Sequence, residues 1–256
     1  MQIKIKCPAK INLDLKVFPI NADGFHPIKS IMQTISLFDY LNISISDGNE
    51  IKLNGNSEEI PYDEKNICHK AAKLYLQTIK QNKEVKIYIE KNIPVCAGLA
   101  GGSTDAAGVL FGLNEIFNKP LDKEELHNLA SQLGSDLNFC LEGGRKLCEG
   151  RGEILTSQKF IEFPITLVKP KKLQISAREA YIAYDNLKKQ SNMPNDLEFA
   201  LIDKYEELKY LHSLGLQMSG SGPTYFIKKE ELGYKLDNNY LIIENLKTID
   251  YGVVKI

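Results

Sequence analysis

Arginine is scarce in this sequence, and its scarcity argues against a nucleic-acid-binding protein. Only Arg145, Arg151 and Arg178 occur among the 256 residues, so lysine supplies nearly all the positive charge. Arginine is the side chain best suited to recognising phosphates and base edges bidentately. The formal net charge of -1 also gives the chain no overall attraction to nucleic acid or to an anionic membrane. Any basic site must therefore be local.

Cysteine is also scarce, and long hydrophobic runs are absent. The five cysteines form no C-x-x-C pair and the four histidines do not cluster with them, which argues against a zinc site. No run approaches the roughly 18 apolar residues of a membrane span, and the N-terminus MQIKIKCPAKINLDLKV lacks the apolar segment of a signal peptide. We therefore expect a cytoplasmic protein with reduced, mostly buried thiols at Cys7, Cys68, Cys96, Cys140 and Cys148.

Apolar periodicity predicts an α+β chain in two parts. Alternation over 3–7, 11–17 and 41–45 predicts strands in the N-terminal third, and EVKIYIEKNIP predicts another. Helical spacing predicts helices in KNICHKAAKLYLQTI, over 103–118, and after Asp122, which pairs with Glu125 as a capping box. Downstream, FPITLVKP, TYFIKK and YGVVKI predict strands, whereas SAREAYIAYDNL and LEFALIDKYEELKYLHSLG predict helices. We place a domain boundary near Ser157, which divides the chain into 1–157 and 158–256.

Glycines concentrate in PVCAGLAGGSTDAAGVL, where a predicted strand leads into a predicted helix. Glycine destabilises regular structure because it loses more conformational entropy on folding than other residues. It also lets an anion approach the backbone N–H groups at the positive end of a helix. The stretch therefore predicts a phosphate site. It lacks the lysine of a Walker A loop and does not match G-x-G-x-x-G. A glycine turn that only lets the helix pack tightly against its strand is the structural alternative.

The same stretch resembles the P-x-x-x-G-L-x-G-G-S-[ST] loop of the GHMP kinases, a family that includes homoserine, mevalonate and galactose kinases. Further stretches, CPAKINLDLKV with DGFHPIKSIMQTI, LGSDLNFCLEGG with CEGRGEIL, and MSGSGPTYF, resemble the branch of the family that phosphorylates a cytidine-diphosphate sugar alcohol of the non-mevalonate isoprenoid pathway. The resemblance implies an α+β fold with an N-terminal ribosomal-S5-domain-2-like domain and a C-terminal ferredoxin-like domain. It also implies ATP, with Mg²⁺ carried by the nucleotide.

This resemblance assigns two catalytic residues. Asp136 in LGSD matches the family's base, which accepts the proton of the substrate 2-hydroxyl. Lys10 in PAKIN matches the partner that holds the carboxylate and a phosphoryl oxygen. From the residues alone, Asp136 is better explained as an acidic residue at a helix start, and Lys10 as a solvated lysine on an edge strand. The family resemblance reverses both interpretations.

The resemblance also implies two sets of binding residues. For ATP they are Pro94, Gly98, Leu99, Ala100, Gly101, Gly102, Ser103, Thr104 and Asn66, with Ser103 or Thr104 as candidates for reaching Mg²⁺. For the substrate they are Asn12, Phe25, His26, Tyr181 and Gly222, with His26 reading the cytosine edge and Tyr181 packing on its ring. Asn66 is equally a helix N-cap. Three positions depart from the family pattern, namely Phe25, Ala177 and Asp105.

Two other functions stay open at this point. A GHMP kinase for another small alcohol would have no use for the imidazole of His26 or the ring of Tyr181. An RNA-binding or scaffold protein could keep the fold without any transfer, although the scarcity of arginine disfavours it. The leading expectation is a kinase whose partners are ATP and a small-molecule substrate, with no nucleic acid and no membrane.

Overall fold

The first half of the chain is built around a large twisted sheet. The computed structural model describes residues 1–22, 24–187 and 191–256. The main path of the sheet has the order β12-β1-β3-β5-β4. These strands are β1 (Gln2–Asn12), β3 (Ile28–Ser46), β4 (Ile51–Gly55), β5 (Glu84–Glu90) and β12 (Val254–Lys255), and β2 (Lys16–Val17), β6 (Arg145–Glu149) and β7 (Ile154–Ser157) extend it. All pairs are antiparallel except that of β4 with β5.

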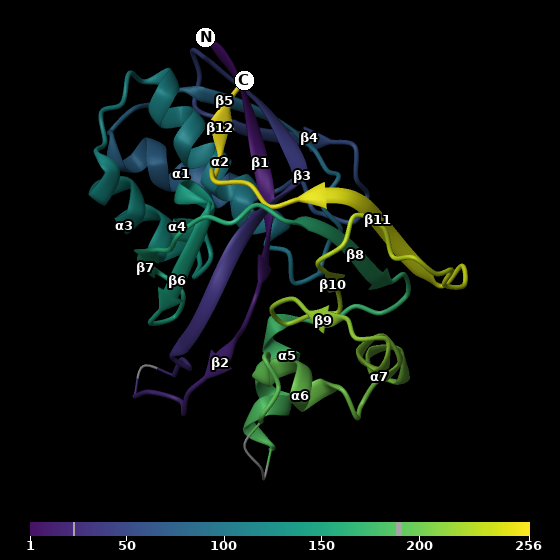
Figure 1. Cartoon of the computed structure of the whole chain (residues 1–256). Coiled ribbons are helices and arrows are strands. Elements are labelled where there is room, and N and C mark those ends of the chain that lie inside the picture. The colour runs from purple at the N-terminus through teal and green to yellow at the C-terminus, as the bar shows by residue number, and fades with distance from the viewer. Residues whose placement is uncertain (23, 188–190) are drawn as a thin grey trace.

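Four helices gather on one side of this sheet (Figure 1). They are α1 (Ile67–Thr78), α2 (Gly101–Ile116), α3 (Lys123–Leu133) and α4 (Leu137–Glu142). The capping box of Asp122 and Glu125 at the start of α3 is confirmed. Helix α2 begins two residues earlier than expected, because the first helical hydrogen bond runs from Thr104 N–H to the Ala100 carbonyl. The glycines therefore form the first turn of the helix itself.

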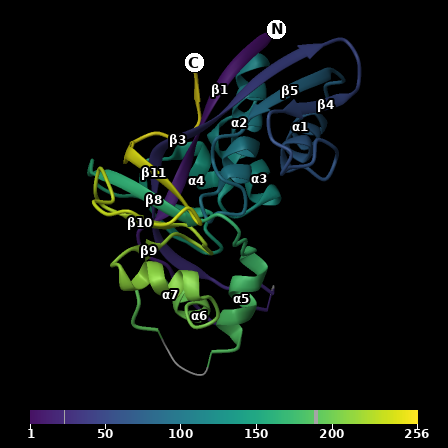
Figure 2. The same ribbon diagram turned by 90° about the vertical axis from the view of Figure 1, so that its right-hand side faces the viewer.

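The second half forms a four-stranded antiparallel sheet of order β11-β8-β10-β9. Its strands are β8 (Pro164–Pro170), β9 (Gln217–Met218), β10 (Tyr225–Ile227) and β11 (Tyr240–Lys247). The helices α5 (Ala177–Asp185), α6 (Asp196–Leu201) and α7 (Glu206–Ser213) lie beyond it (Figure 2). The sequence did not predict β11, and the C-terminal strand β12 pairs with β1 of the first sheet. The domain boundary at residue 157 therefore stays a prediction. The strand β12 does not follow it, because β12 belongs to the second half of the chain but pairs with the first sheet.

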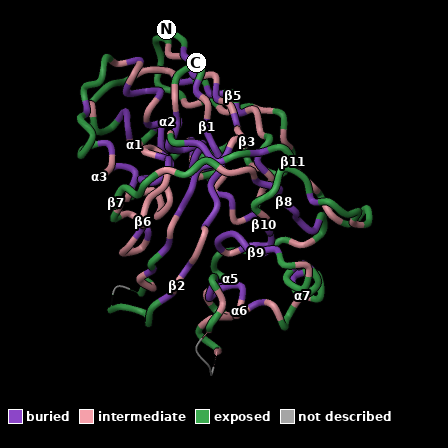
Figure 3. Tube along the Cα trace, in the orientation of Figure 1, coloured by how far each residue is buried: buried purple, intermediate pink, exposed green. Residues whose placement is uncertain are grey.

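Three apolar clusters form the interior. The central strands β1 and β3 are largely buried (Figure 3). One lies between the first sheet and α1–α4. A second packs α5–α7, β8 and β10 against Val17 of β2, Met32 of β3 and Phe139 of α4, so it is shared by both halves. The third contains Ile11 of β1, Leu99 of the loop before α2, and Leu167 and Phe226 of the second sheet. Because this cluster is shared by both halves, it holds the loop before α2 against the second sheet.

An irregularity in the pairing of β1 with β3 precedes the polar residues of β1. The pairing of β1 with β3 shifts between Pro8 and Ala9, where proline lacks the N–H that a regular ladder needs. Bulges re-aim the side chains that follow them. Beyond this irregularity, Ala9 and Ile11 enter the third cluster, so the alternate residues Lys10 and Asn12 face the opposite side.

The cysteines and the helix lengths agree with the sequence expectations. All five cysteines are free, and Cys96 is the exposed one. Burial raises the pKa of the Cys7, Cys68, Cys140 and Cys148 thiols. Within the described ranges, no helix has both the length and the apolar character that crossing a bilayer requires.

Helix α2 approaches the sheet through glycines one turn apart. A Cβ at Gly108 would lie 2.5 Å from Cys7 Sγ and 2.8 Å from a methyl of Leu41, and one at Gly112 would lie 2.7 Å from a methyl of Ile43. Part of the glycine enrichment in this stretch therefore serves close packing, as the structural alternative proposed. The glycines at the start of the helix have a different environment.

We predict that Gly108→Ala destabilises the fold by about 1–3 kcal/mol, because the methyl overpacks the interface of α2 with β1. The higher helix propensity of alanine alone would instead raise the free energy of unfolding by about 1 kcal/mol. Urea unfolding measures the difference, with Gly102→Ala in the same helix as the control, since a Cβ there would meet only an Ile67 methyl at 3.8 Å. Equal or greater stability of Gly108→Ala would contradict this packing.

Candidate active site

Two cavities meet where the two halves of the chain adjoin. The first, here called the loop cavity, has a volume of about 430 Å³ and is bordered by the segment before α2 and the start of α1. The second, called the tyrosine cavity, has a volume of about 230 Å³ and is bordered by Tyr181 of α5. The residues that line both cavities are Lys10, Ser103, Asp136 and Ser221.

The loop before α2 has a backbone that depends on left-handed residues. Gly98 has φ +70°, and a Cβ there would lie 2.3 Å from the Ser219 carbonyl oxygen. Ala100, the N-cap of α2, also has positive φ, at 57°. The Ser219 hydroxyl donates to the Gly98 carbonyl at 3.0 Å and accepts from the Asn12 N–H at 3.3 Å. The turn at 219–222 therefore holds the loop from the other half of the molecule.

The N-terminus of α2 opens onto the loop cavity. The first helical amides have no intrahelical acceptor, and the helix dipole favours a negative charge there. Gly101 and Gly102 line the cavity, and a Cβ at Gly102 would make one ordinary contact, with a methyl of Ile67 at 3.8 Å. This arrangement is suited to binding a phosphate group.

A buried lysine and a carboxylate mark the junction of the cavities. Lys10 is 4% exposed, which excludes a solvated edge-strand lysine. Its Nζ donates to Asn12 Oδ1 at 2.7 Å and lies 3.4 Å from Asp136 Oδ2. Asp136 occupies the N-cap position of α4, but its side chain makes no cap hydrogen bond. Asn12 is held by the Ser30 hydroxyl, which accepts from Asn12 Nδ2 at 2.7 Å.

The predicted loop residues divide into two groups. Leu99 and Thr104 are buried at 1% and 0% exposure and line neither cavity, so Ser103 is the hydroxyl of the pair that reaches the junction. Asn66 lines the loop cavity and also caps α1, since its Oδ1 accepts from Cys68 N–H at 2.8 Å. The other predicted residues that line the loop cavity are Pro94, Gly98, Ala100, Gly101, Gly102 and Ser103.

Of the predicted substrate residues, His26 and Tyr181 are in contact. His26 stacks on Tyr181, with ring centroids 5.5 Å apart and planes 20° apart. Its Nδ1 lies 2.8 Å from the Phe18 carbonyl oxygen and its Nε2 lies 3.1 Å from Asp185 Oδ1. Both imidazole nitrogens therefore already have protein partners in this structure. Burial, and then the charge of Asp136, raises the pKa of the Tyr181 phenol to about 12.

Two of the predicted substrate positions lie away from the cavity walls, and the sequence analysis missed others that line them. Phe25 is 50% exposed and lines neither cavity. Gly222 packs against Met218, whereas Gly220 and Ser221 of the same turn line the tyrosine cavity. The S-G-S-G motif was the signal for this turn. Ala177, one of the departures from the family pattern, lines the tyrosine cavity as well, so it presents a methyl group there.

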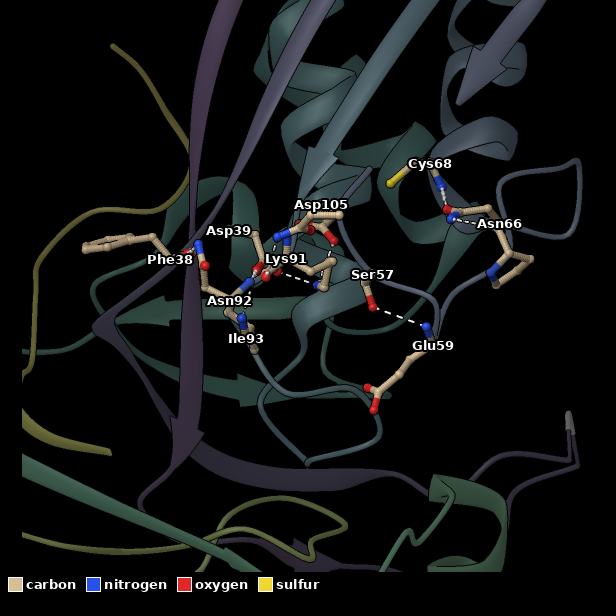
Figure 4. A network of polar contacts seen from close by, with 12 residues as sticks. Phe38, Asp39, Ser57, Glu59, Asn66, Cys68, Lys91, Asn92, Ile93 and Asp105 are labelled. Atoms are coloured by element: carbon tan, nitrogen blue, oxygen red, sulfur yellow. Dashed lines mark hydrogen bonds and ion pairs between the residues drawn. The ribbon is translucent and has the colours of Figure 1, made fainter. Parts of the chain in front are cut away.

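A second buried ion cluster lies where the chain leaves β5 and enters the loop before α2 (Figure 4). Lys91 is paired with both Asp39 and Asp105, and Asp39 Oδ1 also accepts from the N–H groups of Asn92 and Ile93 at 2.6 and 2.8 Å. Burial opposes the charge of Lys91, but the two carboxylates outweigh it and raise the lysine pKa. Burial and the charge of Asp39 raise the pKa of Asp105 to about 8, against the effect of Lys91. The ion pair with Lys91, at 2.9 Å, shows that the Asp105 carboxylate belongs to this cluster.

The site shows no metal cage of its own. Within the described ranges, no group of three His, Cys, Asp or Glu side chains could hold a metal ion. The hydroxyl of Ser103 beside the open helix terminus suits a cation that arrives with phosphates.

The comparisons with known proteins agree with this geometry. The family model of the GHMP kinases N terminal domain matches residues 66–144. A solved homoserine kinase from Cytophaga hutchinsonii superposes with a TM-score of 0.71 at 18% identity, over 100% of this chain and 97% of that one. These matches define the class: the chain has the GHMP kinase fold, and the expected α+β class is confirmed.

Relatives that align with most of the chain identify the family within this class. A 4-diphosphocytidyl-2-C-methyl-D-erythritol kinase from Clostridium beijerinckii is 42% identical over 253 residues, 88% of this chain and 90% of that protein. One from Clostridioides difficile is 38% identical over 97% of both chains. A crystal structure of 4-(cytidine 5'-diphospho)-2C-methyl-D-erythritol kinase has a TM-score of 0.73 at 31% identity, covering 88% and 89% of the two chains. The chain belongs to the family of 4-diphosphocytidyl-2-C-methyl-D-erythritol kinases.

We predict that Asp105→Asn removes a pH dependence of stability. The pKa of Asp105 is raised from 3.8 to about 8, so its contribution is full at acid pH and is lost as pH rises through about 8. From about pH 6 to 8 the free energy of unfolding of the unaltered chain should fall relative to the variant by about 1 kcal/mol per pH unit. Asp47→Asn is the control, because that carboxylate is exposed and the Lys83 hydrogen bond lowers its pKa. Parallel stability curves for Asp105→Asn and the unaltered chain would contradict the prediction.

Proposed function

We propose that this protein transfers the γ-phosphoryl group of ATP to the 2-hydroxyl of 4-diphosphocytidyl-2-C-methyl-D-erythritol, giving the 2-phosphate and ADP. The observation that carries the proposal is the meeting of the two cavities at Lys10 and Asp136. A donor bound in the loop cavity and an acceptor bound in the tyrosine cavity would bring their reacting groups to this point. We also expect the enzyme to work in the cytoplasm, in keeping with its free thiols.

The residues at the junction supply what phosphoryl transfer needs. The reaction requires positioning and charge stabilisation more than covalent help from the protein. The amides at the start of α2 would hold the phosphates, and the ammonium of Lys10 would stabilise the charge of the transferred group. The Asp136 carboxylate is 28% exposed and lines both cavities, and it would orient the hydroxyl and accept its proton. Asn12 keeps Lys10 in place for both tasks.

The nucleotide brings its own cation in this proposal. Mg²⁺ bound to ATP neutralises charge on the β- and γ-phosphates. The Ser103 hydroxyl is the protein group placed to meet it, whereas the buried Thr104 is not.

The tyrosine cavity favours a substrate that carries an aromatic base. The parallel stack of His26 on Tyr181 offers a flat apolar surface and a polar edge, which suit a cytosine ring. A kinase for homoserine or mevalonate would have no ring to place there.

The proposal is tested by incubating the purified chain with ATP, Mg²⁺ and the cytidyl alcohol. We expect ADP and a phosphomonoester on the 2-hydroxyl in equal amounts, with no turnover of homoserine or mevalonate. Phosphorylation of one of those alcohols instead would favour another GHMP kinase. Salt-sensitive RNA binding without any ATP turnover would favour a non-catalytic protein.

We predict that Asp136→Ala lowers turnover by about 10²–10⁴-fold, because the hydroxyl loses the group that orients it and accepts its proton. ATP affinity should stay within about twofold, since the carboxylate contributes no donor to the phosphates. Initial rates and equilibrium binding of ATP separate the two effects. Asp136→Asn serves as the isosteric second variant in case the alanine variant folds poorly. Near-normal turnover in either variant would remove Asp136 from the mechanism.

We predict that Gly102→Ala weakens ATP binding by about tenfold while leaving the fold intact. The methyl fits the fold, since its one contact would be an Ile67 methyl at 3.8 Å, but it would stand at the cavity wall where a phosphate approaches the amides of α2. Isothermal titration with ATP measures the affinity, and KM for the acceptor serves as the internal control. Unchanged ATP affinity would place the phosphates elsewhere.

A further inference from the structure

Asn195 is a buried residue that lies outside both cavities. It is 0% exposed, and it lines neither the loop cavity nor the tyrosine cavity. It is the N-cap of α6, where its Oδ1 accepts from the Leu197 and Glu198 N–H groups at 2.9 and 3.3 Å. Capping a helix requires only an acceptor oxygen. The two N–H donors of the Asn195 amide are therefore not explained by the cap.

Both donors are used by the segment that contains the turn at 219–222. Asn195 Nδ2 donates to the Gly220 carbonyl at 2.8 Å and to the Met218 carbonyl at 3.0 Å. A buried amide is costly unless its polar groups are paired, and here both of its ends are paired. The pairing also determines the orientation of the amide, because backbone carbonyls only accept and the N–H groups of the helix only donate.

The backbone around Asn195 is held by the first half of the chain. Asn195 forms a parallel bridge with Leu15, whose N–H donates to the Pro194 carbonyl at 2.8 Å and whose carbonyl accepts from the Asp196 N–H at 2.9 Å. The Asp196 carboxylate also accepts from the Val17 N–H at 3.0 Å. The side chain of Asn195 therefore reaches the turn from a fixed point.

The turn at 219–222 contacts the reacting end of the site. A Cβ at Gly220 would lie 3.0 Å from Asn12 Oδ1 and 3.2 Å from Lys10 Nζ. The backbone of the turn thus packs directly against the buried ammonium. The Ser219 hydroxyl also accepts from the Asn12 N–H and donates to the loop before α2. Any displacement of the turn would therefore change the surroundings of Lys10.

The hydrogen bonds inside the turn determine its shape and not its place. The Gly222 N–H donates to the Ser219 carbonyl, and the Ser219 N–H donates to the Thr224 carbonyl, both at 2.9 Å. From α6, Glu198 accepts the N–H of the preceding residue, Met218, at 3.1 Å. Asn195 is the α6 cap that reaches the centre of the turn, at Gly220.

Building on the proposed function, we propose that Asn195 is a positioning residue for phosphoryl transfer, whose two N–H donors hold the turn at 219–222 so that Gly220 confines the ammonium of Lys10 at the junction. Asn195 itself touches neither substrate. Without its donors the turn can withdraw and Lys10 gains freedom, so the transfer step slows. The amides of α2 keep their place, because the third apolar cluster and the Asp39 cluster also hold the loop before them.

The first experiment compares Asn195→Ser with Asn195→Asp. Both variants keep an oxygen that can cap α6. The serine hydroxyl is too short to reach Gly220, and the aspartate places a carboxylate oxygen against two carbonyl oxygens. We expect kcat to fall by about 10- to 100-fold in each variant, because a small misplacement of a catalytic group has effects of this size. KM for ATP should stay within about threefold.

Asp122→Ala is the matched control, since it removes the cap of α3 at a residue outside both cavities. It should lower the unfolding midpoint and leave kcat unchanged. A fall in kcat for Asp122→Ala as large as that for Asn195→Ser would show that lost stability alone explains the result, and would overturn the positioning role.

A double-mutant cycle asks whether Asn195 acts through the turn. Ser219→Ala releases the same turn at another attachment. The loss of kcat in the double variant Asn195→Ser with Ser219→Ala should be clearly smaller than the product of the two single losses, because both substitutions free one element. A double variant that shows the full product would mean independent effects and would contradict the proposal.

Hydrogen exchange tests the contact without catalysis. Asn195→Ser should speed exchange of the Ser219 and Gly222 amides by at least about tenfold and leave the amides of α6 unchanged, since the cap is kept. Faster exchange in α6 alone, or an unaltered kcat, would reduce Asn195 to a helix cap and overturn the proposal. If the unaltered chain does not turn over the cytidyl alcohol, the proposed function fails instead, and the exchange rates still decide whether Asn195 holds the turn.

Discussion

The structure of the site depends on one buried ammonium group. Lys10 is almost wholly removed from water, and an unpaired charge in that position would cost several kcal/mol. The Asn12 amide oxygen and the Asp136 carboxylate compensate it. Meeting these partners requires the register shift between β1 and β3, the placement of α4 and the hydrogen bond between Asn12 and Ser30. A lysine that is expensive to bury is thus held where two cavities join.

The same constraint explains how the two halves of the chain cooperate. The turn at 219–222 crosses from the second half and bonds to both Gly98 and Asn12, while the third apolar cluster fastens the loop of Gly98 against the second sheet. On the other side, Asp39 and Lys91 secure the point where the chain leaves β5. The loop is therefore anchored from both sheets, which preorganises its amides before any ligand binds.

Local sequence patterns predicted the elements that are determined locally. The capping box of α3, the helix after the glycines and the alternating strands β1 and β5 all follow from short-range periodicity and capping. The pairing of β12 with β1 joins the two ends of the chain and leaves no local trace. The family resemblance named Lys10 and Asp136, and their proximity in the structure comes from residues 126 positions apart in sequence. Asn195, Ser221 and the Asp39–Lys91–Asp105 cluster were missed, because their role arises from contacts between distant segments.

The most direct test of the account is a crystal structure with a non-hydrolysable ATP analogue and the cytidyl alcohol bound together. The account predicts that the nucleotide phosphates lie against the amides of Gly101 and Gly102. The terminal phosphate should then contact Lys10, and the 2-hydroxyl should be within hydrogen-bond reach of Asp136. A phosphate tail outside the loop cavity, or a hydroxyl bound away from Asp136, would contradict it.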